Sequence, residues 1–271
     1  MIYQPYDWFQ FMPGWTDHLE AAELALLERA DAIVTPSESF SAGLAKKAGR
    51  DIGVIPNGVD MEMFEAALAS PPAAPADLAA IPHPRMGYVG NLEPFVDLLL
   101  IAELAQRHTD WHFVIVGGRS PRPGDLLAQG LAACEARPNV HFLGVKPRSE
   151  VPAYLLNMDV NLICLRIGEG GWADVAYPQK LQEYMACGCP IVSADLHAVR
   201  TQFSHLIRTA QGADSWEAAI ADALLTGGPG TAAARTAVAR ENSWAHRAAQ
   251  LESLCQEVLA RRQLGDNRAA V

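Results

Sequence analysis

The chain has 271 residues, 50% of them hydrophobic and 19% charged, with a formal net charge of −10 at pH 7. Its length suits one large or two modest domains, and its acidic balance argues against nucleic acid as a main partner, because phosphate contacts need clustered Lys and Arg. No apolar run approaches the roughly 20 residues of a membrane span, and the N-terminus lacks the basic and apolar regions of a secretory signal. We therefore expect a cytoplasmic protein, for which peripheral contact with the inner face of a membrane stays open.

The cysteines and histidines predict neither a disulfide framework nor a metal site. There are five cysteines, an odd number, without a CxxC pair, and eight histidines without an HExxH spacing. Reduced thiols are the usual state in cytoplasmic proteins. We expect no metal and no bound cofactor.

The first sixty residues contain a few scattered elements. Residues 20–30 have helical spacing, and residues 32–35 form an apolar strand. Asn57 and Gly58 are typical of a turn, because both accept left-handed dihedral angles. Residues 66–84 are rich in Ala and Pro and poor in charge, so we expect a linker and an irregular approach to a second domain.

From about residue 85 onward strands alternate with helices, which is the signature of a parallel α/β sheet. The first three strands end in glycine, at Gly90, Gly117 and Gly144, and open α/β sheets bind ligands at these carboxyl ends. Glycine permits close approach of a phosphate or ribose to the backbone, although turn chemistry alone would also explain it. The expected strands are 86–90, 111–118, 140–144, 160–165 and 191–193, with helices at 98–106, 215–224 and 241–262.

Residues 177–195 predict a short helix, a stop and a buried strand. Lys180 and Glu183 are three residues apart and share one helical face, while the apolar residues around them can cover the core side. Gly188 fits a helix C-terminus, and the proline that follows prevents continuation. The free N–H groups at the helix start, after the glycine-rich loop 168–171, suit a phosphate group. Spacing alone favours a solvated surface pair, because charges at helical spacing usually face water.

This segment resembles the nucleotide-sugar site of retaining glycosyltransferases with two Rossmann-like domains, the GT-B fold of the glycogen-synthase-like, group 1 enzymes. Their pattern is Glu, seven residues, Glu, then Ala-x-x-x-Gly-x-Pro-Val-Val; Glu183 matches the second Glu and residues 188–192 match the tail. Val175 stands where the family has the first Glu, but a subset without it has Pro-x-Lys-Leu-x-Glu-Tyr, as at residues 178–184. Further segments that resemble the family are residues 30–37, 55–60 and 242–247.

The resemblance implies an α/β fold with a doubly wound, Rossmann-like parallel sheet and a partial second Rossmann-like domain. We expect an acceptor-domain remnant at residues 1–62, a linker at 63–84, a nucleotide-sugar-binding domain at 85–228 and a C-terminal helical segment at 229–271 that packs back towards the N-terminal part. A full member would have roughly another hundred residues before Met1, judged by ordinary domain size, so we expect an N-terminally truncated member.

The resemblance also implies the donor site. Glu183 would bind the ribose hydroxyls. The other implied residues are Gly90, Asn91, Tyr177, Pro178 and Lys180 around the diphosphate, and the backbone near Gly117, Val145 and Lys146 at the base. Asn91 stands where the family has an arginine, which leaves Lys180 and Lys146 as candidate cations, and Glu169 or Asp174 could replace the carboxylate absent at Val175. No Asp-x-Asp triplet stands at a strand end, so we expect the donor to be held without a metal.

In function, the resemblance implies a retaining, metal-independent glycosyltransferase that moves a sugar from a nucleoside diphosphate to a glycan or lipid-linked acceptor, typically in polysaccharide or glycolipid synthesis. The absence of the first Glu and of the arginine favours an alternative, a non-catalytic nucleotide-sugar-binding or scaffold module. An epimerase on the same fold is a third interpretation. The sequence names neither the sugar, the base, the acceptor nor the oligomeric state.

Overall fold

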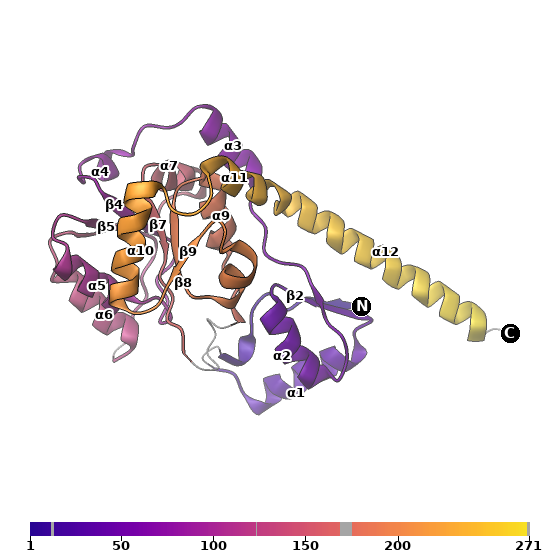
Figure 1. Cartoon of the computed structure of the whole chain (residues 1–271). Coiled ribbons are helices and arrows are strands. Elements are labelled where there is room, and N and C mark those ends of the chain that lie inside the picture. The colour runs from indigo at the N-terminus through magenta and orange to yellow at the C-terminus, as the bar shows by residue number, and fades with distance from the viewer. Residues whose placement is uncertain (12–13, 123, 169–174, 270–271) are drawn as a thin grey trace.

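A computed structural model describes residues 1–11, 14–122, 124–168 and 175–269 of the chain (Figure 1). It contains two parallel sheets, one of three strands in the order β1-β2-β3 and one of six strands in the order β6-β5-β4-β7-β8-β9. The predicted α/β class with a doubly wound parallel sheet is confirmed. None of the described helices is both long and apolar enough to cross a membrane.

The N-terminal part, residues 1–60, is built on the small sheet. Its elements are β1 (Ile2–Tyr3), the 3₁₀ turn η1 (Phe9–Phe11), α1 (Asp17–Arg29), β2 (Ala32–Thr35), α2 (Glu38–Ala48) and β3 (Gly53–Val54). The side chains of Thr16 and Ser37 cap the two helices by accepting backbone N–H groups, the usual role of these residues at a helix start. The predicted strand at 32–35 is confirmed, and the predicted helix begins three residues earlier than expected. A small separate core is formed by Leu27, Ala30, Ile33, Phe40 and Leu44.

The segment between the two sheets is more ordered than its composition indicates. The composition of residues 66–84 predicts a linker and an irregular approach to the second domain, but the structure has the end of α3 (Met61–Ala69) and the short α4 (Ala76–Ala79) here. Phe64 and Leu78 are fully buried in the main core, and this burial outweighs the Ala and Pro content of the segment.

The large sheet has a reversal of strand order at its centre. Its strands are β4 (Arg85–Val89), β5 (His112–Val116), β6 (Val140–Gly144), β7 (Val160–Ile163), β8 (Ile191–Ala194) and β9 (Arg208–Ala210), all parallel to their neighbours. The chain proceeds outward from β4 to β6 and then returns to β7 on the other side of β4. The crevice at the carboxyl ends of β4 and β7 is therefore the topological switch point, where such sheets bind ligands. The five predicted strands are present, and β9 is an addition.

Helices cover both faces of this sheet (Figure 1). They are α5 (Leu98–Arg107), α6 (Leu126–Glu135), α7 (Val151–Leu156) with the 3₁₀ turn η2 (Arg148–Glu150), α9 (Gln179–Cys187), the π-helical turn η3 (Val199–Phe203), α10 (Ala213–Thr226) and α11 (Ala232–Glu241). The side chain of Arg235 on α11 is 3% exposed, and its guanidinium group is surrounded by backbone carbonyl groups. Its guanidinium donates to the carbonyl oxygens of Gly188, Leu206, Gly227 and Pro229.

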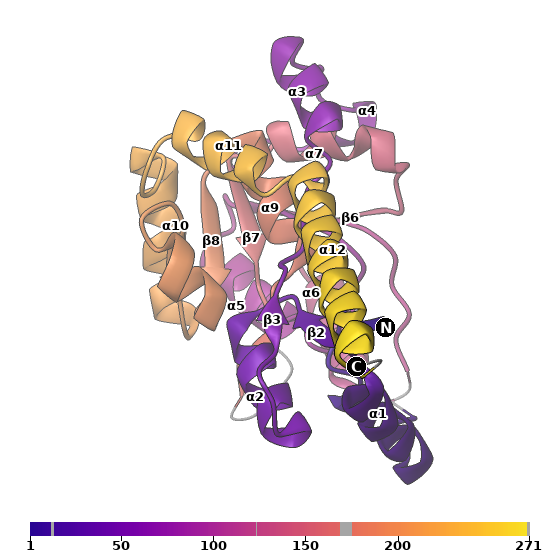
Figure 2. The same ribbon diagram turned by 90° about the vertical axis from the view of Figure 1, so that its right-hand side faces the viewer.

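The last helix, α12 (Trp244–Ala269), runs from α11 back along the N-terminal part, as Figure 2 shows. The backbone N–H of Trp244 donates to the carbonyl of Val59 at 3.0 Å, and Arg262 forms an ion pair with Asp31 at 2.7 Å. The terminal segment therefore contacts the N-terminal part at both of its ends. This arrangement fixes the N-terminal part opposite the carboxyl edge of the large sheet.

Candidate functional site

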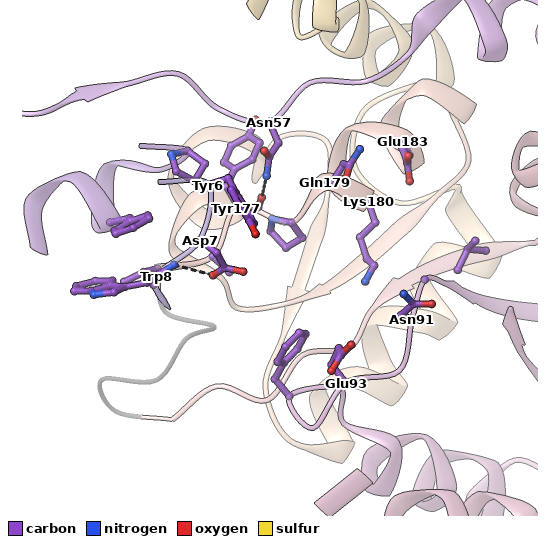
Figure 3. Close-up of a pocket in the computed structure, with 18 residues that line it drawn as sticks. Tyr6, Asp7, Trp8, Asn57, Asn91, Glu93, Tyr177, Gln179, Lys180 and Glu183 are labelled. Atoms are coloured by element: carbon purple, nitrogen blue, oxygen red, sulfur yellow. Dashed lines mark hydrogen bonds between the residues drawn. The ribbon is translucent and has the colours of Figure 1, made fainter. Parts of the chain in front are cut away.

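A cavity of about 510 Å³ lies between the N-terminal part and the carboxyl edge of the large sheet (Figure 3). One wall comes from the N-terminal part, and the other comes from the loop after β4 and the start of α9. We call this cavity the cleft. Its lining includes Tyr6, Asp7, Trp8, Pro36, Phe40, Asn57, Val89, Gly90, Asn91, Glu93, Phe95, Val175, Ala176, Tyr177, Pro178, Gln179, Lys180 and Glu183.

Two of the strand-end glycines are required by the conformation of the backbone, and Gly117 also by close packing. Gly90 has φ 147° and Gly117 has φ 149°, backbone angles that residues with a side chain rarely adopt. A Cβ atom on Gly117 would lie 2.0 Å from the carbonyl oxygen of Gly90. The N–H of Gly90 in turn donates to the carbonyl of Val116 at 2.8 Å. The ends of β4 and β5 are therefore locked together beside the cleft.

Lys180, in the first turn of α9, reaches across to the end of β4. Its Nζ donates to the Tyr88 hydroxyl at 2.8 Å and lies 4.4 Å from the centre of that ring. A Cβ atom on Gly90 would be 3.0 Å from this Nζ, so the amine lies directly over the Gly90 backbone. Burial lowers the pKa of Lys180 to about 8. Among the described residues no carboxylate lies within 4.0 Å of it, which leaves a cation available to an incoming anion.

Glu183, one turn further along α9, is also largely removed from water. Its side chain is 15% exposed, and the nearest cation is Arg148, whose Nη2 is 3.5 Å from Oε1. Burial raises the pKa of Glu183, and the charges of Arg148 and Lys180 oppose that rise. A carboxylate in this position accepts hydrogen bonds from hydroxyl groups that enter the cleft.

Tyrosine hydroxyls fix the start of α9 and its neighbours. The Tyr184 hydroxyl accepts the N–H of Val89 at 2.8 Å and donates to the Val89 carbonyl at 3.2 Å. Gln182 donates to the Tyr177 hydroxyl at 2.6 Å, and burial raises the pKa of Tyr177 to about 12. The helix is thus fastened to the sheet by groups other than Lys180 and Glu183.

The N-terminal part holds the loop before α9 through its carbonyl groups. The Asn57 side chain donates to the Tyr177 carbonyl at 2.8 Å, and the Ser37 hydroxyl donates to the Val175 carbonyl at 2.5 Å. These two bonds join the walls of the cleft.

Most of the residues predicted for the donor site come together. Gly90, Asn91, Tyr177, Pro178, Lys180 and Glu183 line the cleft. Gly117 lies next to the cleft, because its backbone contacts Gly90. The Val145 side chain lies near Gly118, the residue that follows Gly117, and is 74% exposed.

Three predicted residues need separate comment. The amine of Lys146 is paired with Asp77 at 2.6 Å and lies outside the cleft lining, so the structure does not place it as a free cation there. Its backbone remains a predicted contact for the base. Glu169 and Asp174, the suggested substitutes for a carboxylate at position 175, lie outside the described residues, as does most of the glycine-rich loop.

The cleft contains two further acidic residues that no sequence motif indicates. Asp7 comes from the N-terminal part and Glu93 from the loop after β4, 86 residues later in the chain. Within the described part of the chain, no group of three or more His, Cys, Asp or Glu side chains could hold a metal ion.

Comparisons with known proteins bear on the family and the fold. Residues 83–226 match the family model described as glycosyl transferases group 1. TuaH of Bacillus subtilis (strain 168), which is named as a teichuronic acid biosynthesis glycosyltransferase, is 30% identical over 181 residues. The match covers 66% of this chain and 44% of TuaH, so the chain spans less than half of that relative.

Solved structures with low sequence identity share the architecture. Anabaena Alr3699/HepE, in complex with UDP-glucose, aligns with a TM-score of 0.72 at 16% identity, over 94% of this chain and 72% of that one. Sucrose-phosphate synthase from Thermosynechococcus elongatus aligns with a TM-score of 0.70 at 18% identity, over 96% and 68%. These likenesses show the GT-B-like fold. With the family match over more than half of its length, the chain belongs to the group 1 glycosyl transferases.

Proposed function

We propose that this chain binds a nucleoside diphosphate sugar in the cleft and transfers the sugar, with retention and without a metal, to a glycan or lipid-linked acceptor. The observation that carries the proposal is the environment of Lys180. Its amine lies over Gly90 at the switch point of the sheet, and among the described residues its hydrogen-bond partner is a hydroxyl group rather than a carboxylate. A buried cation without an anionic partner is costly in the free protein and favours an anionic ligand.

The diphosphate would lie between β4 and the start of α9. The first N–H groups of a helix have no partner within the helix, and its dipole favours an anion at this end. Lys180 adds a full positive charge, and the backbone at Gly90 and Asn91 closes the other side. Glu183 would accept the ribose hydroxyls, and the backbone near Gly117, Val145 and Lys146 would contact the base.

Transfer in this site would depend on positioning and on charge stabilisation. The bond between the anomeric carbon and the β-phosphate oxygen breaks, and its electron pair leaves with the diphosphate, next to Lys180. The acceptor oxygen forms the new bond on the same face of the sugar, and its proton passes to the departing phosphate oxygen. A preorganised cation and helix N-terminus stabilise the charge that develops on the leaving group.

A second candidate is a module that binds the nucleotide sugar without turnover. Val175 in place of a carboxylate, and Asn91 in place of an arginine, remove two groups that the resemblance assigns to the donor.

The acceptor class that we propose for this chain follows the name of a relative. TuaH is named for the biosynthesis of teichuronic acid, a polysaccharide, and we propose a polysaccharide acceptor for this chain too.

A transfer assay separates the two candidates. The chain is incubated with radiolabelled UDP-glucose, GDP-mannose or ADP-glucose and a panel of octyl glycosides, and the labelled glycoside is quantified. We expect a donor-dependent product of retained anomeric configuration. At a donor concentration below saturation, Glu183→Ala should lower its yield by roughly ten- to a hundredfold, and the exposed control Glu62→Gln should not. Nucleotide binding without any product across donors and acceptors would leave the binding module as the function.

A further inference from the structure

Val175 stands where the family has its first glutamate, and its contacts in the cleft do not offer a substitute for that carboxylate. Val175 lines the cleft with an apolar side chain, and its carbonyl accepts the Ser37 hydroxyl at 2.5 Å. The carbonyl group of this residue is therefore already hydrogen-bonded, and its side chain offers no polar group to a sugar. If the site holds a sugar, its hydroxyl groups need an acceptor from elsewhere in the cleft.

Glu93 supplies a carboxylate on the other wall of the same cleft. It is exposed, lines the cleft, and forms no ion pair within 4.0 Å among the described residues. Its charge is close enough to Lys180 to raise the pKa of that lysine against the effect of burial. Figure 3 shows Glu93 on the loop below the end of the Lys180 side chain. The carboxylate thus lies beside the place proposed for the diphosphate, where the attached sugar would begin.

The loop that carries Glu93 is held in place by several hydrogen bonds, although Glu93 itself is exposed. Backbone bonds tie it to two neighbouring strand ends, and a tyrosine hydroxyl ties it to its own strand. These bonds run from Leu92 N–H to the Gly118 carbonyl at 2.8 Å, from Arg166 N–H to the Phe95 carbonyl at 2.8 Å, and from the Tyr88 hydroxyl to the Asn91 carbonyl at 3.0 Å. A rigid support of this kind is what a binding residue needs in order to select one ligand geometry.

Asp7 adds a second carboxylate from the opposite wall. Its Oδ1 accepts the N–H of Trp8 at 2.8 Å, which orients the side chain. In Figure 3 the Asp7 carboxylate points into the cleft, towards the end of Lys180. The part of the cleft between the two walls is therefore acidic on both sides, apart from Lys180.

We propose that Glu93 takes the place of the carboxylate absent at Val175 and accepts the hydroxyl groups of the donor sugar, so that with Asp7 it selects a neutral, hydroxyl-rich sugar over a sugar that bears a carboxylate. This inference rests on the proposed function. Carboxylates accept sugar hydroxyls in charge-assisted hydrogen bonds, whereas a third carboxylate would meet like charge on both walls of a partly enclosed site. Selection would thus combine an attractive contact with a repulsive one.

Calorimetric titration with three ligands tests the proposal. UDP, UDP-glucose and UDP-glucuronic acid are titrated at one salt concentration into the wild-type chain, Glu93→Gln and the control Glu62→Gln, an exposed glutamate on α3. GDP, GDP-mannose and GDP-mannuronic acid take their place if GDP is the nucleotide bound. The amide keeps the size of the carboxylate and removes its charge.

For the wild type we expect UDP-glucuronic acid to bind at least about tenfold more weakly than UDP-glucose. Glu93→Gln should leave UDP affinity within about twofold, weaken UDP-glucose by roughly five- to tenfold and strengthen UDP-glucuronic acid. Equal affinity for the two sugars in the wild type, or an unchanged ratio in Glu93→Gln, would overturn the inference while UDP binding left the proposed function standing. Failure of every nucleoside diphosphate to bind would remove both.

Discussion

Replacement of Lys180 by methionine should make the free protein more stable and its ligand binding weaker. Burial lowers the pKa of Lys180 from 10.5 to about 8, which corresponds to roughly 3 kcal/mol of destabilisation by the charged form. Because the folded-state pKa lies below the unfolded-state value, this cost is complete below pH 8 and disappears as the pH rises to about 10.5. Methionine has a similar length and no charge, and the Tyr88 hydroxyl keeps its bond to the Asn91 carbonyl.

At pH 7 we expect Lys180→Met to raise the free energy of unfolding by about 1–3 kcal/mol, less than the full cost because part of the side chain is solvated. The gain should shrink between pH 8 and pH 10. The same change removes the cation proposed for the diphosphate, so nucleotide affinity should fall by roughly ten- to a hundredfold, as expected for the loss of one charge-assisted hydrogen bond.

Urea unfolding at pH 7 and pH 9.5, together with calorimetric nucleotide titration, measures both effects. Lys46→Met on the exposed face of α2 is the matched control, and it should change neither quantity by more than about 0.5 kcal/mol. A Lys180→Met variant that is less stable than wild type, or that binds the nucleotide equally well, would refute the account of this lysine.

Three further predictions concern the scaffold. Gly117→Ala should destabilise the chain by at least about 2 kcal/mol, because its Cβ would overlap the Gly90 carbonyl. Gly144 has φ 72° and open space around it, so Gly144→Ala should cost only about 1 kcal/mol. Urea unfolding of the two variants distinguishes close packing from backbone strain alone. Arg235→Met leaves four carbonyl groups without their donor and should lower the free energy of unfolding by about 3 kcal/mol, and a change below 1 kcal/mol would contradict this. Limited proteolysis should cut within residues 1–60 first, because that part has a small core of its own, and initial cleavage in the large sheet would argue otherwise.

Much of the large sheet could be predicted because its strands are apolar runs separated by helices. The strands that pattern reading misses are short. β9 has three residues and β1 has two, and such segments are defined by pairing with a neighbour rather than by their own composition. The helices α3 and α4 were hidden by the Ala and Pro content of their segment, although Phe64 and Leu78 anchor them in the core.

The candidate site could be predicted where it is local in sequence. Lys180 and Glu183 share one helical turn, and the strand-end glycines follow apolar runs, so these local patterns together with the family resemblance indicate them. Asp7 and Glu93 reach the cleft only through folding, because no short motif joins them to α9. The pairing of Lys146 with Asp77, 69 residues away, is likewise not evident from the sequence, and it engages a lysine that the resemblance places near the base.

The most direct test of the central claim is nucleotide binding in the cleft. UDP, GDP and ADP are titrated by calorimetry into the wild-type chain, Glu183→Ala and the control Glu62→Gln. We predict that one nucleotide binds, that Glu183→Ala weakens it by roughly ten- to a hundredfold, and that the control binds as the wild type does. Absence of binding by all three, or equal binding by Glu183→Ala, would contradict the assignment of this cleft as the donor site.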